Sequence, residues 1–358
     1  MSSPATTPDT QPTQPSKSSS EAPAPVKRSL ASRVMIRPEI GAVAAAIAIF
    51  IFFFAIAPAF RTLPSFSTVL YASSTIGIVA VGVALLMIGG EFDLSSGVTV
   101  VTAALACTLI TFQLSLNMWV GVIVSLVVAL AIGFINGYLV VKTKIPSFLI
   151  TLSTFFMLRG INLGVTKAAT GTVASANVSG LDGFLAAKAL FAADVPLGFI
   201  TVKVTVLWWL LFVAIGSWIL LRTKIGNWIF AAGGNADSAR AVGVPVPKVK
   251  IGLFMGVSFL AWFYGMHLLF NFSSVQSGLG IGNEFIYIIA AVVGGCLLTG
   301  GYGSVVGAAV GAFIFGMTTQ GIVFAGFDPN WFYTFLGAML LLAVLVNLYI
   351  KNYASTRR

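Results

Sequence analysis

The sequence predicts an all-α integral membrane protein with about ten transmembrane helices and both termini in the cytoplasm. Three observations predict this fold class: an apolar composition, a series of apolar segments long enough to cross a bilayer, and an uneven distribution of basic residues between the loops. Apolar residues make up 58% of the 358 positions and charged residues only 8%, and the mean hydropathy is +0.99. A soluble protein carries about 25% charged residues, so this composition indicates a surface that faces lipid.

The apolar segments predict the individual spans. A helix needs about 20 apolar residues to cross the hydrocarbon core, and lipid offers the backbone no hydrogen-bond partners, so each span must be helical. Ten segments fit, of which the third and eighth are short and bounded by glycines. The predicted spans are residues 40–60, 68–88, 97–114, 118–140, 147–164, 204–221, 251–270, 284–299, 304–323 and 331–350.

Basic residues predict the orientation, because cytoplasmic loops are enriched in Lys and Arg. With the N-terminus inside, fifteen of them fall in cytoplasmic segments and four in external ones, which favours an even number of spans and accounts for the net charge of +10 without a nucleic-acid partner. The predicted organisation is a disordered cytoplasmic tail over residues 1–38, rich in Ser, Thr and Pro, a transmembrane domain over 39–350 and a cytoplasmic tail over 351–358. The longest loops are the external loop 165–203, with a short amphipathic helix on the membrane, and the cytoplasmic loop 222–250.

A polar segment with the sequence GGEFDLSSG, residues 89–97, lies between the second and third predicted spans. Gly89 and Gly90 favour the end of a helix, and Asp93 or Ser95 suits the N-cap of the next one. Two interpretations follow from these residues. One is a discontinuous helix that places polar backbone beside a substrate, and the other is a tight cytoplasmic turn followed by a capped helix.

The cytoplasmic loop 222–250 carries the signals of one short helix. Asn235 is a good N-cap, Asp237 suits the positive end of the helix dipole, and Gly243 suits the C-terminal cap. The two prolines that follow prevent its continuation. A helix of about two turns is unstable alone, so we expect it to dock, either on the inner surface of its own chain or on a partner.

Few other residues suggest chemistry. Arg159 lies within the fifth span, where a charge is costly without water or a partner, and Glu284 opens the eighth span, where an acid favours the helix dipole. We expect His267, the only histidine, to be packed or hydrogen-bonded. Cys107 and Cys296 lie in apolar segments, and we expect both to be free packing residues.

Missing motifs exclude several classes of protein. The chain has no G-x-x-x-x-G-K-[ST] loop for ATP and no H-E-x-x-H motif, and one histidine cannot make a multi-histidine metal site. No series of acids runs through the spans, as proton-coupled carriers often show. We therefore predict a chain that is not an enzyme, with no catalytic site, metal or cofactor of its own.

Four ordered blocks of sequence carry a resemblance to a known family. Residues 89–97 are similar to a Gly-Gly-x-x-Asp-Leu-Ser block, and residues 233–244, GGNADSARAVGV, to a cytoplasmic Gly-Gly-Asn-x-x-x-Ala-Arg-x-x-Gly-Ile segment. The other two blocks are NGYLVVKTKIPSFLITLSTFFMLRG, residues 136–160, and GNEFIYIIAAVVGGCLLTGGYGSVVGAAVGAFIFG, residues 282–316. Together they resemble the ribose/xylose-type (monosaccharide) permease family of binding-protein-dependent ABC importers.

The resemblance implies a permease subunit of the bacterial inner membrane that forms the path for a monosaccharide or small polyol. It implies three partners: a periplasmic sugar-binding protein, a second permease chain in a homodimer or with a similar partner, and an ATPase subunit that binds ATP and Mg²⁺ and docks on the cytoplasmic helix. The implied ATPase-coupling residues are Gly234, Asn235, Asp237, Ala239, Arg240 and Gly243. The candidate pathway residues are Phe92, Asp93, Ser95, Asn136, Arg159 and Glu284.

Two alternatives remain open at this point. A related ABC permease for branched-chain amino acids would share the fold, but its substrate carries two charges. A self-sufficient secondary transporter or channel would need no docking helix. The sequence does not name the sugar, because pentoses, hexoses, polyols and cyclic autoinducers all suit such a path.

Overall fold

The computed structural model of the protein describes residues 38–356, with side chains described over residues 39–345. The predicted disordered tail, residues 1–38, lies outside the described residues except at its last position. The predicted C-terminal tail, residues 351–358, overlaps the last helix, which runs to Thr356, and its final two positions lie outside the described residues.

Eight helices in the described part of the chain are long and apolar enough to cross a membrane. Each coincides with a predicted span, which confirms the fold class of an all-α multi-pass membrane protein. Side-chain caps fix several helix starts: Thr62 accepts a hydrogen bond from the Ser65 amide, and Asn117 accepts one from the Trp119 amide. The eight are α2 (Pro38–Ile56), α3 (Leu63–Ile88), α4 (Ser96–Gln113), α5 (Met118–Thr143), α6 (Ser147–Thr170), α8 (Val204–Arg222), α11 (Val246–Phe272) and α13 (Val305–Phe324).

The other two predicted spans correspond to α12 and α14, whose lengths differ. α12 (Asn283–Val293) has 11 residues, so it is about 16 Å long and too short for a hydrocarbon core of about 30 Å. The eighth predicted span, residues 284–299, is therefore wrong as a continuous transmembrane helix, because Gly295 at φ +93° follows the helix end. α14 (Trp331–Thr356) has 26 residues and covers the whole of the tenth predicted span.

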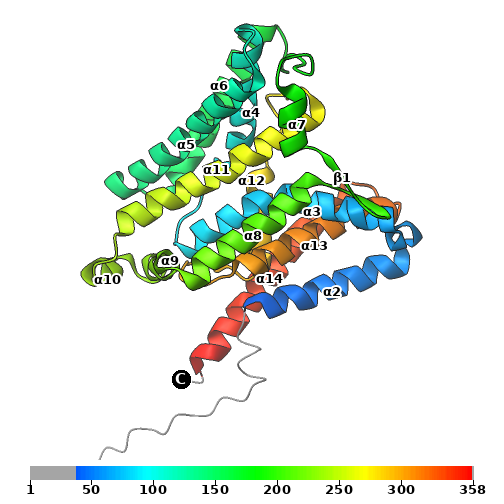
Figure 1. The fold of residues 1–358 in the computed structure, drawn as a ribbon. Coiled ribbons are helices and arrows are strands. Elements are labelled where there is room, and N and C mark those ends of the chain that lie inside the picture. The colour runs from blue at the N-terminus through cyan, green and yellow to red at the C-terminus, as the bar shows by residue number, and fades with distance from the viewer. Residues whose placement is uncertain (1–37, 357–358) are drawn as a thin grey trace, which may run out of the picture. The chain divides into compact units, whose positions relative to one another are not determined.

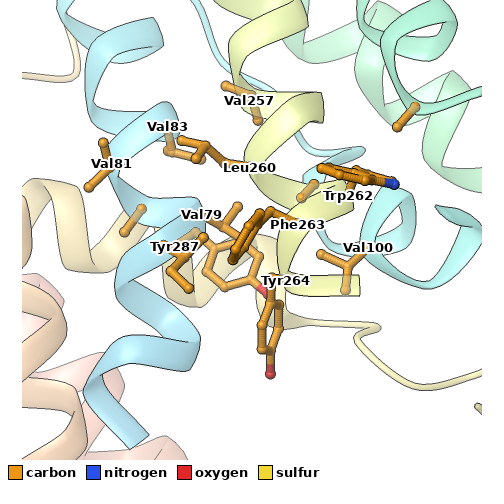
Figure 2. Close-up of a cluster of buried hydrophobic side chains, with 14 of the residues drawn as sticks. Val79, Val81, Val83, Val100, Val257, Leu260, Trp262, Phe263, Tyr264 and Tyr287 are labelled. Atoms are coloured by element: carbon orange, nitrogen blue, oxygen red, sulfur yellow. The ribbon is translucent and has the colours of Figure 1, made fainter. Parts of the chain in front are cut away.

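α3, α4, α11 and α13 form the centre of the bundle. Between 67% and 78% of the apolar window of each is buried, against 11% for α2. Glycines bring the helices close together, as is common in membranes: a Cβ on Gly265 of α11 would lie 2.3 Å from the Val100 carbonyl oxygen of α4. Figure 2 shows part of this core, with labelled side chains from α3 (Val79, Val81, Val83), α4 (Val100), α11 (Val257, Leu260, Trp262, Phe263, Tyr264) and α12 (Tyr287).

The predicted external loop, residues 165–203, is more ordered than expected. α7 (Phe184–Phe191), the short helix predicted in this loop, packs Phe184, Ala187 and Phe191 against the protein, next to α11, and leaves Leu185 exposed. The strands β1 (Asp194–Leu197) and β2 (Ile200–Lys203) form an antiparallel hairpin that the sequence did not predict. Figure 1 places α7 and β1 at one end of the bundle and α9 and α10, described below, at the other.

Candidate functional site

The segment between α3 and α4, residues 89–95, is called the polar break below. Gly89 ends α3, and Gly90 adopts φ +83°, a left-handed conformation that favours glycine. The Glu91 amide then donates to the Leu86 carbonyl at 3.1 Å. The predicted helix end at the two glycines is confirmed, and the chain continues without helical structure until α4 begins.

A buried chain of polar side chains connects the polar break to α5 and α6. One carboxylate oxygen of the fully buried Asp93, Oδ1, accepts hydrogen bonds from the Ser95 amide at 2.8 Å and the Ser95 hydroxyl at 2.6 Å. The Ser95 hydroxyl accepts from Nδ2 of Asn136 at 2.9 Å, and Oδ1 of Asn136 accepts from the Thr154 hydroxyl at 2.6 Å. Within the described residues, Asp93 Oδ2 has no hydrogen-bond partner. Three predicted pathway residues, Asp93, Ser95 and Asn136, therefore meet in one network. In this network Asp93 accepts the hydrogen bonds of Ser95, the residue just before α4.

Hydroxyl groups of α6 satisfy the backbone of the polar break. The amide of the half-buried Phe92 donates to the Ser147 hydroxyl at 3.0 Å, and the Leu94 amide donates to the Thr151 hydroxyl at 3.1 Å. With Thr154, these two hydroxyl residues follow helical spacing along one face of α6. The spacing of these three hydroxyl residues is visible in the sequence, although only Asn136 and the residues of the polar break were predicted for this site.

Glu284 lies against the first turn of α4. It is buried in the first turn of α12, and both carboxylate oxygens are 3.1 Å from the Gly282 amide, which donates to them. A Cβ on Gly97 of α4 would lie 2.4 Å from Glu284 Oε2 and 2.8 Å from the Gly280 carbonyl oxygen. The structure thus brings a second buried acid to the start of α4, whose positive dipole end stabilises negative charge.

Arg159 lies apart from this network. Its side chain is exposed on the surface of α6, five positions beyond Thr154 and within the apolar span. A guanidinium at such a position needs water or another protein beside it, because lipid does not solvate the charge. Of the predicted pathway residues, the structure groups all but Arg159 around the polar break and the first turn of α4.

The predicted docking helix is present, but it is not isolated. Two consecutive helices occupy the loop, α9 (Lys224–Gly234) and α10 (Ala236–Ala241), where the sequence predicted only the second. The Asn235 side chain accepts from the Ser238 amide at 2.8 Å, and Gly243 follows α10 at φ +85°. Both predicted caps are confirmed. The residues of α9 were predicted as part of the cytoplasmic loop, without a helix of their own.

Residues of α9 and α10 line a shallow groove of about 360 Å³. The two helices lie at one end of the bundle (Figure 1). The Ala239 side chain points inward and is buried, whereas Asp237 and Arg240 are exposed and form an ion pair. Val242, just after α10, is 79% exposed. The groove is lined by Phe230, Ala231, Gly234, Asn235, Ser238, Ala239 and Val242.

The remaining candidates have structural roles. His267 is buried, with Nδ1 2.9 Å from the Phe191 carbonyl oxygen and Nε2 3.0 Å from the Tyr71 hydroxyl, which confirms a packed, hydrogen-bonded histidine. Cys107 and Cys296 are both buried and free, as predicted. In the part of the chain that the structure describes, no group of three or more His, Cys, Asp or Glu residues is placed to hold a metal ion.

Comparisons with known proteins place this geometry in context. The sequence model of the family described as "Branched-chain amino acid transport system / permease component" matches residues 65–344. The chain is 30% identical to the ribose import permease protein of Escherichia coli, over 82% of this chain and 88% of that protein. It is 32% identical to the galactose/methyl galactoside import permease protein of Escherichia coli, over 81% and 88%. It is 29% identical to the xylose transport system permease protein of the same organism, over 84% and 89%. No solved structure matches the chain at a significant level.

Proposed function

Because the chain belongs to the family of transport-system permease components that matches residues 65–344, we propose that it forms the transmembrane path of an ABC importer for a monosaccharide or a similar small polyol. The observation that carries the proposal is the set of relatives that match over most of their length and whose names specify ribose, galactose or xylose transport. The polar break fits such a neutral solute, since its carboxylate and amide groups suit the hydroxyls of a sugar.

The buried charges favour a sugar over a branched-chain amino acid. Among residues 39–345, the buried charged side chains are Glu91, Asp93 and Glu284, and all three are acids. An amino acid brings a carboxylate of its own. A buried carboxylate needs either a cation beside it or a helix N-terminus that has no other acid nearby, because like charges repel. The first turn of α4 already has two acids beside it, so it suits a neutral solute better.

The groove of α9 and α10 supports dependence on a separate ATPase rather than a self-sufficient carrier. The chain has no phosphate-binding loop, so ATP and Mg²⁺ would be bound by the partner subunit. In this proposal Asn235, Asp237 and Arg240 present polar groups to the ATPase, and Val242 supplies an apolar contact. Ala239 anchors α10 on its own chain, and Gly243 allows the turn that ends it.

Arg159 supports a second permease chain. Its exposed guanidinium lies in an apolar span, so the surrounding face of α6 should meet either a partner chain or a water-filled path, and a homodimer with a central path provides both. At the opposite end of the bundle from α10, we expect a periplasmic sugar-binding protein to dock. This orientation corresponds to a bacterial inner membrane with both termini in the cytoplasm.

Reconstituted transport tests the proposed function. The permease, its cognate ATPase and its binding protein are assembled in liposomes, and uptake of labelled ribose, galactose, xylose and leucine is measured. We expect ATP-dependent uptake of at least one sugar and none of leucine. Uptake of leucine alone, or sugar uptake that proceeds without the ATPase, would exclude the proposal.

The role of α10 gives a separate prediction. Gly243→Val places a β-branched residue at φ +85°, where the strain is about 1–2 kcal/mol or more, and should distort the end of the docking helix. We expect weaker ATPase binding in a pull-down from detergent and a loss of coupled uptake. Gly171→Val is the matched control, because Gly171 ends α6 at φ +73° in equally open space. Equal ATPase binding by the two variants would remove the docking role.

A further inference from the structure

An ion pair joins the polar break to α11. Lys250 Nζ donates to Glu91 Oε1, and the two side chains are only 17% and 10% exposed. Glu91 belongs to the polar break, whereas Lys250 is the fifth residue of α11, just after the segment that follows α10. Neither residue takes part in the polar network around Asp93 or in the groove of α9 and α10.

A backbone contact joins the same break to the end of α9. A Cβ on Gly233 would lie 1.8 Å from the Ile88 carbonyl oxygen and 2.8 Å from the Gly301 amide nitrogen. A Cβ on Gly90 would lie 3.2 Å from the Gly233 Cα. The Gly301 amide donates to the same Ile88 oxygen at 2.8 Å. The end of α3, the end of α9 and the loop after α12 therefore meet through main-chain atoms, without side chains between them.

These two contacts flank α10 along the chain. Gly233 lies three residues before α10, and Lys250 lies nine residues after it. Both reach the start of the polar break, and the acid that Lys250 binds is two residues from Asp93. A displacement of α10 would therefore act on the polar break through the segment before α10 and through the segment after it.

We propose that Glu91 and Lys250 are positioning residues that transmit the movement of α9 and α10 to the polar break, and so couple ATP hydrolysis to the opening of the path. The proposal rests on the proposed function. A link between two elements that move requires a contact that holds in more than one arrangement. This mostly buried ion pair meets the requirement, because separating its partners leaves a charge poorly solvated, while its long side chains adapt to small shifts.

A charge swap tests the proposal in the full reconstituted complex. The variants are Glu91→Lys, Lys250→Glu and the double swap, and the measured quantity is solute taken up per ATP hydrolysed, alongside ATPase binding. We expect each single variant to bind the ATPase but to lose at least about 10-fold in this ratio, within the range typical of coupling between sites. The double swap should recover the ratio to within about 3-fold.

Two further sets of variants keep the test decisive. If a charge reversal does not assemble, Glu91→Gln and Lys250→Gln replace it, and each should lower the ratio in the same direction. The ion pair of Asp194 and Lys203 on the hairpin, whose side chains are more exposed at 60% and 25%, provides the matched control, and its reversal should leave the ratio unchanged.

Unchanged ratios in the single variants, or a double swap no better than they are, would overturn the link. Uptake by the wild-type complex distinguishes this outcome from a failure of the proposed function, because the wild-type measurement shows which solute is transported. If it carries a solute other than a sugar, the same variants test the link with that solute.

Discussion

Replacing Gly233 with alanine is expected to destabilise the protein severely and to abolish transport. The new Cβ would lie 1.8 Å from the Ile88 carbonyl oxygen and 2.8 Å from the Gly301 amide nitrogen. No side-chain rotation relieves this clash, because the Cβ position is fixed by the backbone and both neighbours are backbone atoms. α9 would have to move away from α3, which breaks the contact between the docking region and the polar break. Overpacking of this kind costs about 1–3 kcal/mol or more. Thermal unfolding in detergent and sugar uptake in liposomes are the measurements.

Gly234 provides the matched control in the next position. A Cβ on Gly234 meets nothing within 4 Å, and alanine is favoured over glycine in a helix by about 1 kcal/mol. Gly234→Ala should therefore unfold at the wild-type temperature or slightly above it. If Gly233→Ala unfolds at the same temperature as Gly234→Ala, the close contact between α9 and α3 is not present in the folded protein.

Most of the transmembrane helices were predictable, because each helix that crosses a bilayer must consist of about 20 predominantly apolar residues. The helix end at Gly89 and Gly90 and the cap at Asn235 were predictable as well, since glycine permits positive φ and an amide side chain replaces missing helical acceptors. Such signals act within a few residues, so a single sequence reveals them. The free cysteines followed from their apolar surroundings in the same way.

The features that the sequence did not reveal depend on contacts between distant segments. α12 ends at Val293, although apolar residues continue through Leu298, because the turn at Gly295 and not hydropathy decides its length. The ion pair of Glu91 with Lys250 joins residues 159 positions apart. Hydropathy and local caps carry no information about such a pairing, and Lys250 was predictable only as one more basic residue of a cytoplasmic loop.

The buried network around Asp93 is the second place where a single change should have a large effect. In Asp93→Ala the Ser95 amide and hydroxyl, both buried, lose their acceptor, and each unsatisfied buried group costs about 1–3 kcal/mol. The Ser95 hydroxyl also accepts from Asn136, so its displacement would reach α5 and α6. We expect sugar uptake to fall at least about 10-fold, together with a lower unfolding temperature.

The effect of the Asp93 charge can be separated from that of its hydrogen bonds. Asp93→Asn keeps an oxygen acceptor for Ser95, so it should unfold near the wild-type temperature; if the negative charge serves the path, its uptake should still fall. Asp328→Ala is the matched control for Asp93→Ala, because the exposed Asp328 accepts from the amide two residues ahead in the same way, at 2.9 Å from Asn330. Wild-type uptake by both Asp93 variants would reduce this acid to a dispensable cap. Normal uptake by Asp93→Asn alone would show that the path needs the hydrogen bonds of the polar break and not its charge.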